Sequence, residues 1–161
     1  MITNQRQYAI SQGELRRFEE ALAEALSREP SPDVDPAIHR AMQQSLVSEI
    51  EELQGQIERY EGLRDGKIRN RVLRSLREVP YALVEARIAA NLTQKDLAIR
   101  VGLAEQQIQR YESSAYTGVA LERLQDLADA LEVNLNLTIA FRQTTYDEGP
   151  AGHRLSLEVD R

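Results

Sequence analysis

The sequence contains no cysteine and no tryptophan, and it has only two histidines, His39 and His153. The absence of cysteine excludes a disulfide framework, a thiolate zinc site and a cysteine nucleophile. Two histidines leave little for metal or general-base chemistry, and no glycine-rich phosphate loop is present. We therefore expect a protein that is not an enzyme and that carries neither a metal nor a cofactor.

Long hydrophobic runs are also missing. No apolar stretch approaches the roughly 18 residues that a bilayer span requires. Residues 1–12 are polar, unlike the apolar core of a secretory signal. These absences predict a soluble cytoplasmic protein.

Aromatic residues are scarce, at 5% of the 161 residues, although hydrophobic residues make up 42%. This composition favours packed helices over a β-sandwich or a β-barrel. A chain of this length is expected to form one domain or two small ones.

The net charge of −6 is unevenly distributed along the chain. Residues 67–115 carry nine basic and five acidic side chains, a net charge of +4, whereas residues 33–66 carry −5 and residues 116–161 carry −4. A basic segment inside an acidic chain is what local binding of phosphate groups requires. A solvated charged face would have the same composition, so charge alone leaves both interpretations open.

Two helical patterns fill residues 1–66, which we expect to form a helical hairpin or an oligomerisation region. The stretch from Ser11 to Glu14 has the form of a capping box and predicts the start of the first helix. Asp35 and Pro36 predict the start of the second helix, which runs to about Arg64.

The second helix carries a heptad seam, because its apolar residues alternate between steps of four and three. Only two heptads are clean, fewer than the three or four that identify a coiled coil. Either the first helix or a second copy of the chain could bury this seam. The sequence is therefore compatible with an intramolecular hairpin and with self-association. Gly55 and Gly62 are expected on the outer face. The seam residues are Leu46, Ile50, Leu53, Ile57 and Tyr60.

Residues 67–79 are predicted to form a basic linker, with five basic side chains and no acidic one between positions 67 and 77. These basic side chains have two possible roles. They could make non-specific contacts with phosphate groups, or they could neutralise the acidic residues in the preceding helix. If the linker is helical, Val72, Leu73 and Leu76 are expected to pack inward.

Four short helical patterns follow in residues 80–132, at about 81–90, 94–101, 105–113 and 121–131. Thr93 is a favourable N-cap for the second pattern. Gly102 lies where a turn needs a positive φ, and the small Ala98 lies where two steeply crossing helices touch. Apolar residues at fixed offsets complete the pattern of a helix-turn-helix, in which the second helix is presented outward. They are Leu97, Val101, Leu103, Ile108 and Tyr111.

This segment resembles the Cro/C1-type helix-turn-helix domain, also called the XRE family. The resemblance is carried by residues 86–98 (ARIAANLTQKDLA), 101–103 (VGL), 108–112 (IQRYE) and 124–131 (LQDLADAL). It implies a DNA-binding domain of four or five helices that acts as a dimer on a two-fold-related operator. The long N-terminal extension lies outside the common pattern of the family.

The resemblance also assigns DNA-binding residues. Thr93, Gln94 and Lys95 lie at a helix N-terminus, which favours phosphate, and Gln94 resembles the family's phosphate contact. The base-contacting positions of the third helix carry Gln106, Gln107, Gln109 and Arg110. Glutamine can bond bidentately to adenine, and arginine can bond bidentately to guanine.

Other family positions imply structural roles or depart from the pattern. An Arg87–Glu112 pair is expected to fix the third helix against the scaffold. Ala104 replaces a capping side chain and weakens the start of that helix, and Glu105 is not expected to contact bases. Tyr116 and Thr117 are candidates for further phosphate contacts.

Residues 133–161 show a period of two in their apolar residues, at 135–141 and again at 155–159. This period predicts strands and hence a small C-terminal β-hairpin. A partly disordered tail is the alternative, because an isolated two-stranded hairpin is marginal. The expected fold is thus mainly α, with a helical hairpin or coiled coil, a helix-turn-helix domain and a β-hairpin tail.

The sequence favours a sequence-specific regulator of transcription that binds double-stranded DNA as a homodimer and acts as a repressor. An antitoxin that binds a cognate toxin protein and regulates its own operon is an alternative. A protein–protein adaptor without DNA binding is a second one, favoured by the acidic total charge and by Glu105.

Overall fold

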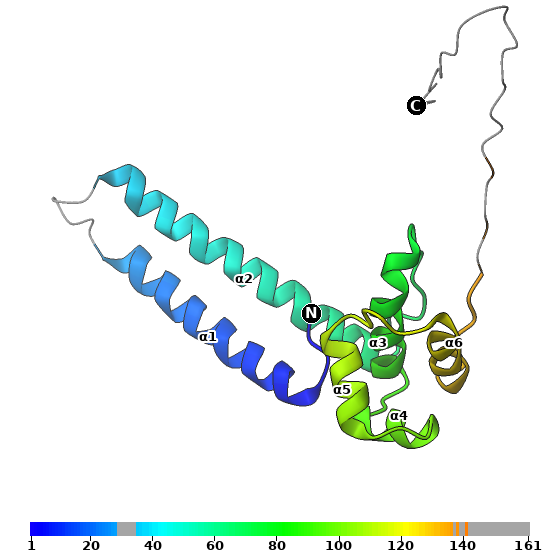
Figure 1. The fold of residues 1–161 in the computed structure, drawn as a ribbon. Coiled ribbons are helices and arrows are strands. Elements are labelled where there is room, and N and C mark those ends of the chain that lie inside the picture. The colour runs from blue at the N-terminus through cyan, green and yellow to red at the C-terminus, as the bar shows by residue number, and fades with distance from the viewer. Residues whose placement is uncertain (29–34, 137, 139–140, 142–161) are drawn as a thin grey trace, which may run out of the picture.

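The structure, a computed structural model, describes residues 1–28, 35–136, 138 and 141. The described residues form a mainly helical fold, as predicted, and contain no strand (Figure 1). Residues 133–136, 138 and 141 have no regular structure, and the other residues of the predicted β-hairpin lie outside the described residues. The helices are α1 (Gln5–Ser27), α2 (Pro36–Arg64), the 3-10 helix η1 (Leu76–Glu78), α3 (Val79–Ala89), α4 (Gln94–Arg100), α5 (Glu105–Ser113) and α6 (Leu121–Ala130).

Helices α1 and α2 lie side by side as a long hairpin (Figure 1). Helix α2 begins as predicted, because an Asp35 carboxylate oxygen accepts a hydrogen bond from the amide of Ala37 at 2.7 Å. Three seam residues of α2 are buried, namely Ile50, Ile57 and Tyr60. The seam is therefore buried at least in part within one chain.

The predicted start of the first helix is wrong. Helix α1 begins at Gln5, and its N-cap is Asn4, whose side-chain oxygen accepts from the amide of Gln7 at 2.9 Å. The capping-box pattern at 11–14 therefore lies inside the helix. The extra turns have tertiary partners, because the ring of Tyr8 stacks on that of Tyr60 with centroids 5.1 Å apart.

The linker also differs from the prediction. Residues 67–75 form no helix, and Val72 and Leu76 are exposed at 86% and 70% rather than packed inward. Leu73, in contrast, is half-buried and packs against the core as expected. The chain turns at Gly66 and folds back over α2, where the amide of Ile68 donates to the carbonyl oxygen of Gly62 at 3.0 Å. Gly62 is therefore buried rather than on the outer face, because Ile68 covers it.

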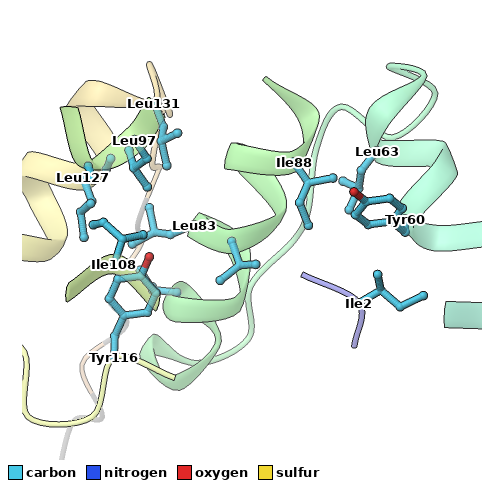
Figure 2. Close-up of a cluster of buried hydrophobic side chains, with 14 of the residues drawn as sticks. Ile2, Tyr60, Leu63, Leu83, Ile88, Leu97, Ile108, Tyr116, Leu127 and Leu131 are labelled. Carbon is cyan, nitrogen blue, oxygen red and sulfur yellow. The ribbon is translucent and has the colours of Figure 1, made fainter. Parts of the chain in front are cut away.

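Helix α3 is the centre of the core, and its two sides contact different parts of the molecule. Figure 2 shows Leu83 among the side chains of Ile108 and Leu127, on the side of α5 and α6. On the other side, Ile88 lies near Leu63 and Tyr60 of α2. One helix thus joins the hairpin to the helix-turn-helix segment.

A buried carboxylate links α3 to α2 and to the linker. Glu85 of α3 is 4% exposed and accepts hydrogen bonds from Arg59 of α2 at 2.7 Å and from Arg71 of the linker at 2.9 Å. The bond to Glu85 raises the pKa of Arg59. Arg71 thus neutralises an acidic residue of α3 rather than the acidic residues of α2.

Candidate nucleic-acid interface

The turn between α4 and α5 contains the capping, glycine and small residues from which the sequence pattern predicted it. Thr93 and Asp96 form a reciprocal capping box at the start of α4. The hydroxyl and amide of Thr93 both donate to Asp96, at 2.6 and 2.9 Å, and these bonds lower the pKa of that carboxyl group. Gly102 has φ +66° in the turn, and Ala98 is buried at 2% exposure. Helix α5 is thereby held at a fixed angle to α4.

A buried ion pair fixes α5 against α3. Arg87 donates from Nε and Nη2 to the two carboxylate oxygens of Glu112, at 2.6 and 2.7 Å, and both side chains are at most 3% exposed. The guanidinium also donates to the carbonyl oxygens of Leu92 and Thr3, at 2.8 and 2.7 Å. Such a bidentate, charge-assisted contact sets orientation as well as distance.

The three residues assigned to phosphate binding lie together where α4 begins. Thr93 and Lys95 are exposed. Gln94 is half-buried, and its amide nitrogen donates to Glu112 at 2.8 Å. The ion pair that positions α5 therefore also orients Gln94.

The four base-contact candidates on α5 divide into two groups. Gln106 and Arg110 are exposed, and within the described part of the chain neither side chain makes a hydrogen bond or an ion pair; the guanidinium of Arg110 lies 6.0 Å from the ring centroid of Tyr111. Gln109 is also exposed but donates to Glu105 at 3.1 Å. Gln107 is half-buried and donates to the hydroxyl of Tyr111 at 2.8 Å. Gln106 and Arg110 are thus the side chains most available to a ligand.

The loop after α5 corrects one expectation. Tyr116 is 3% exposed, so its side chain cannot reach a phosphate group. Its buried hydroxyl has no hydrogen-bond partner among the described residues. Burial, together with the nearby charge of Glu112, raises its pKa far above the usual value. Thr117 is exposed and donates to the carbonyl oxygen of Ser114 at 2.7 Å.

Sequence reasoning missed a cleft of about 1020 Å³ beside the start of α4. We call it the junction cleft. One wall is the N-terminal segment and the first turn of α1, and the opposite wall belongs to α4 and α5. No sequence pattern links the two walls, since they lie about 90 residues apart. The residues that line the cleft include Thr3, Gln5, Arg6, Arg64, Thr93, Gln94, Glu105 and Gln109.

The geometry defines a helix-turn-helix with its second helix presented outward. Residues 83–137, about a third of the chain, match the family model described as Helix-turn-helix. This segment is therefore a helix-turn-helix of the Cro/C1 type, as the sequence resemblance implied, and the match supports a DNA-binding regulator of transcription. Neither a curated protein nor a solved structure matches the chain. Within the described ranges, no helix is both long and apolar enough to pass through a bilayer.

Proposed function

We propose that this protein is a sequence-specific regulator of transcription that binds an operator in double-stranded DNA and acts as a repressor. The observation that carries the proposal is the exposed face of α5, where Gln106 and Arg110 present side chains that make no hydrogen bond to any described residue. These side chains are free to contact the edges of base pairs in a major groove.

The chemistry of this face fits duplex DNA. The guanidinium of Arg110 can bond bidentately to O6 and N7 of guanine, and the amide of Gln106 can bond to N6 and N7 of adenine. Thr93, Gln94 and Lys95 would contact the adjacent phosphates, whose contribution to affinity falls as salt concentration rises. Gln109 and Gln107 would contribute after exchanging their present partners, Glu105 and Tyr111.

The proposed repressor is a dimer, because each chain carries one α5 and a two-fold operator has two half-sites about 34 Å apart. The α1–α2 hairpin is the proposed surface of self-association. It exposes large apolar side chains that its own seam does not bury. They are Ile10, Leu26, Ile38, Met42 and Val47, exposed by 39–65%.

The same apolar side chains favour a second candidate, an antitoxin whose hairpin covers a toxin protein. The two candidates predict different masses in solution. Light scattering on the purified chain distinguishes them: a dimer supports self-association. A monomer that forms a 1:1 complex with the product of an adjacent small gene supports the antitoxin.

A gel-shift experiment tests the DNA-binding proposal. The probe is the DNA upstream of the protein's own coding sequence, at 50 mM and 200 mM salt. We expect a shifted band that weakens at the higher salt concentration and is lost in the double variant Gln106→Ala/Arg110→Ala. The absence of a shift at both salt concentrations would contradict the proposal and favour an adaptor that binds only proteins.

A further inference from the structure

The N-terminal segment is anchored directly beside the DNA-binding helices. Ile2 is 3% exposed and belongs to the main hydrophobic core. The carbonyl oxygen of Thr3 accepts a hydrogen bond of 2.7 Å from Arg87, whose guanidinium also holds Glu112 of α5. The start of α1 and α5 are therefore fixed relative to each other by one buried side chain.

The first turn of α1 faces the proposed phosphate-binding residues across the junction cleft. Figure 1 shows the beginning of α1 beside α5. Gln5 and Arg6 line the cleft on one side, and Thr93 and Gln94 line it on the other. A DNA strand whose phosphates contact the start of α4 would pass the opening of this cleft.

The rim of the cleft on the side of the hairpin carries positive charge. Arg6 is exposed and forms no ion pair with any residue that the structure describes. Arg64, at the end of α2, donates to the side-chain oxygen of Gln5 at 3.2 Å, and among the described residues it too has no acidic partner. In contrast, the charges of Arg87 and Glu112 at the inner end of the cleft neutralise each other.

We propose that Arg6 binds a backbone phosphate of the same duplex whose bases α5 contacts. This inference rests on the proposed function and extends it: the DNA interface includes the first turn of the N-terminal hairpin. The phosphate contacts of Thr93, Gln94 and Lys95 are then continued by a cation from a segment outside the helix-turn-helix match. Such a contact adds affinity that does not depend on base sequence.

The test compares two charge-neutralising variants of the full-length protein, Arg6→Gln and Arg16→Gln. Both arginines are exposed on α1, but Arg16 lies ten residues further along, about 15 Å away along the helix axis, and does not line the cleft. The probe is a duplex that the wild-type protein selects from a pool of random sequences. Fluorescence anisotropy measures the dissociation constant between 50 and 300 mM salt.

We expect Arg6→Gln to weaken binding about fivefold to tenfold at low salt and to reduce the slope of log K against log salt by about 1, as the loss of one phosphate contact requires. Arg16→Gln should stay within about twofold of the wild type, since its exposed charge is remote from the interface. Arg6→Lys keeps the charge and should retain the wild-type slope. Thermal melting of all three variants checks that the fold is intact.

Three results would overturn the inference. The first is an Arg6→Gln variant with the affinity and salt slope of Arg16→Gln, while the wild type still binds its selected duplex; this result leaves the proposed function standing. The second is a wild-type protein that selects no duplex, which contradicts the proposed function together with this inference. Tighter binding by Arg6→Gln would also contradict it, because the first turn of α1 would then oppose DNA.

Discussion

The helix-turn-helix segment and the outer half of the hairpin are both helical, but they differ in what stabilises them. Helices α4 and α5 have only seven and nine residues, yet Leu97 and Ile108 on them are 0% exposed. Helix α1 has 23 residues and none of them is buried. In α2, the first buried residue is Ile50, halfway along the helix. The short helices therefore depend on a shared core, whereas the outer hairpin keeps apolar side chains available for a partner.

Removal of the buried cation from the helix-turn-helix core should have the largest effect. Arg87→Met leaves the carboxylate of Glu112 buried without its cation, although Gln94 still donates to it, so we expect the free energy of unfolding to fall by about 3–5 kcal/mol. Urea denaturation measures the change. The matched variant is Arg59→Met, which leaves Glu85 paired with Arg71 and should cost much less. Equal losses in the two variants would contradict the view that the core depends on the Arg87–Glu112 pair.

Substitutions in the outer hairpin should act on association rather than on folding. Leu26 and Met42 are exposed by 65% and 62% in the single chain. Each contributes about 1.5–3 kcal/mol if a second copy buries it fully. We expect Leu26→Ser/Met42→Ser to weaken self-association at least tenfold in sedimentation equilibrium, with little change in the thermal stability of the helix-turn-helix. A variant that associates as strongly as the wild type would place the dimer contact elsewhere.

Removal of the unpartnered hydroxyl of Tyr116 should change the stability of the fold by a smaller amount, and should raise it rather than lower it. Tyr116→Phe removes a buried polar group without a hydrogen-bond partner, and we expect it to stabilise the fold by about 1 kcal/mol. The wild type should also lose stability above pH 10. Tyr116 then ionises in the unfolded chain, whose tyrosine pKa is about 10, while the raised pKa keeps it protonated in the fold.

Denaturation curves at pH 8 and pH 10.5 test both parts of this prediction. The difference in stability between the two pH values should be smaller in Tyr116→Phe than in the wild type. A phenylalanine variant that is less stable at pH 8 would show that the hydroxyl has a partner in solution.

Substitutions at the two glycines of α2 should have the smallest effects on stability. Gly55 lies on an open side of the helix, whereas Gly62 lies under Ile68. A Cβ at Gly55 would meet no atom within 4 Å, so Gly55→Ala should stabilise the helix by about 0.5–1 kcal/mol. At Gly62 a Cβ would lie 2.9 Å from Cδ1 of Ile68, and displacement of that side chain should offset the gain. Thermal melting of the two variants should therefore show a higher Tm for Gly55→Ala alone. Equal increases would mean that Ile68 does not cover α2 in solution.

Local rules were enough to predict several elements. Asp35 with Pro36 indicated where α2 begins, and the structure starts it there. The left-handed conformation expected at Gly102 is present, with φ of 66°. Thr93 caps α4 as predicted. In each case the information lies within a few residues of the chain, where capping and turn chemistry act.

The features that sequence reasoning missed depend on contacts between distant segments. Nothing near Ile2 indicates that it enters the core beside residues far along the chain, and nothing near Arg6 indicates a cleft shared with Gln94. Tyr8 stabilises the early start of α1 by stacking on Tyr60, 52 positions later. Gly62 is buried although the heptad pattern places it away from the seam, because that pattern does not include the linker that folds back over it.

NMR chemical-shift mapping can test directly whether α5 enters a groove of DNA. The experiment adds a duplex selected by the wild-type protein to the isotopically labelled full-length chain. If α5 binds in the groove, the largest backbone amide shifts should fall at residues 93–95 and 105–113. Shifts confined to the outer hairpin, with those of Gln106 and Arg110 unchanged at saturation, would contradict it.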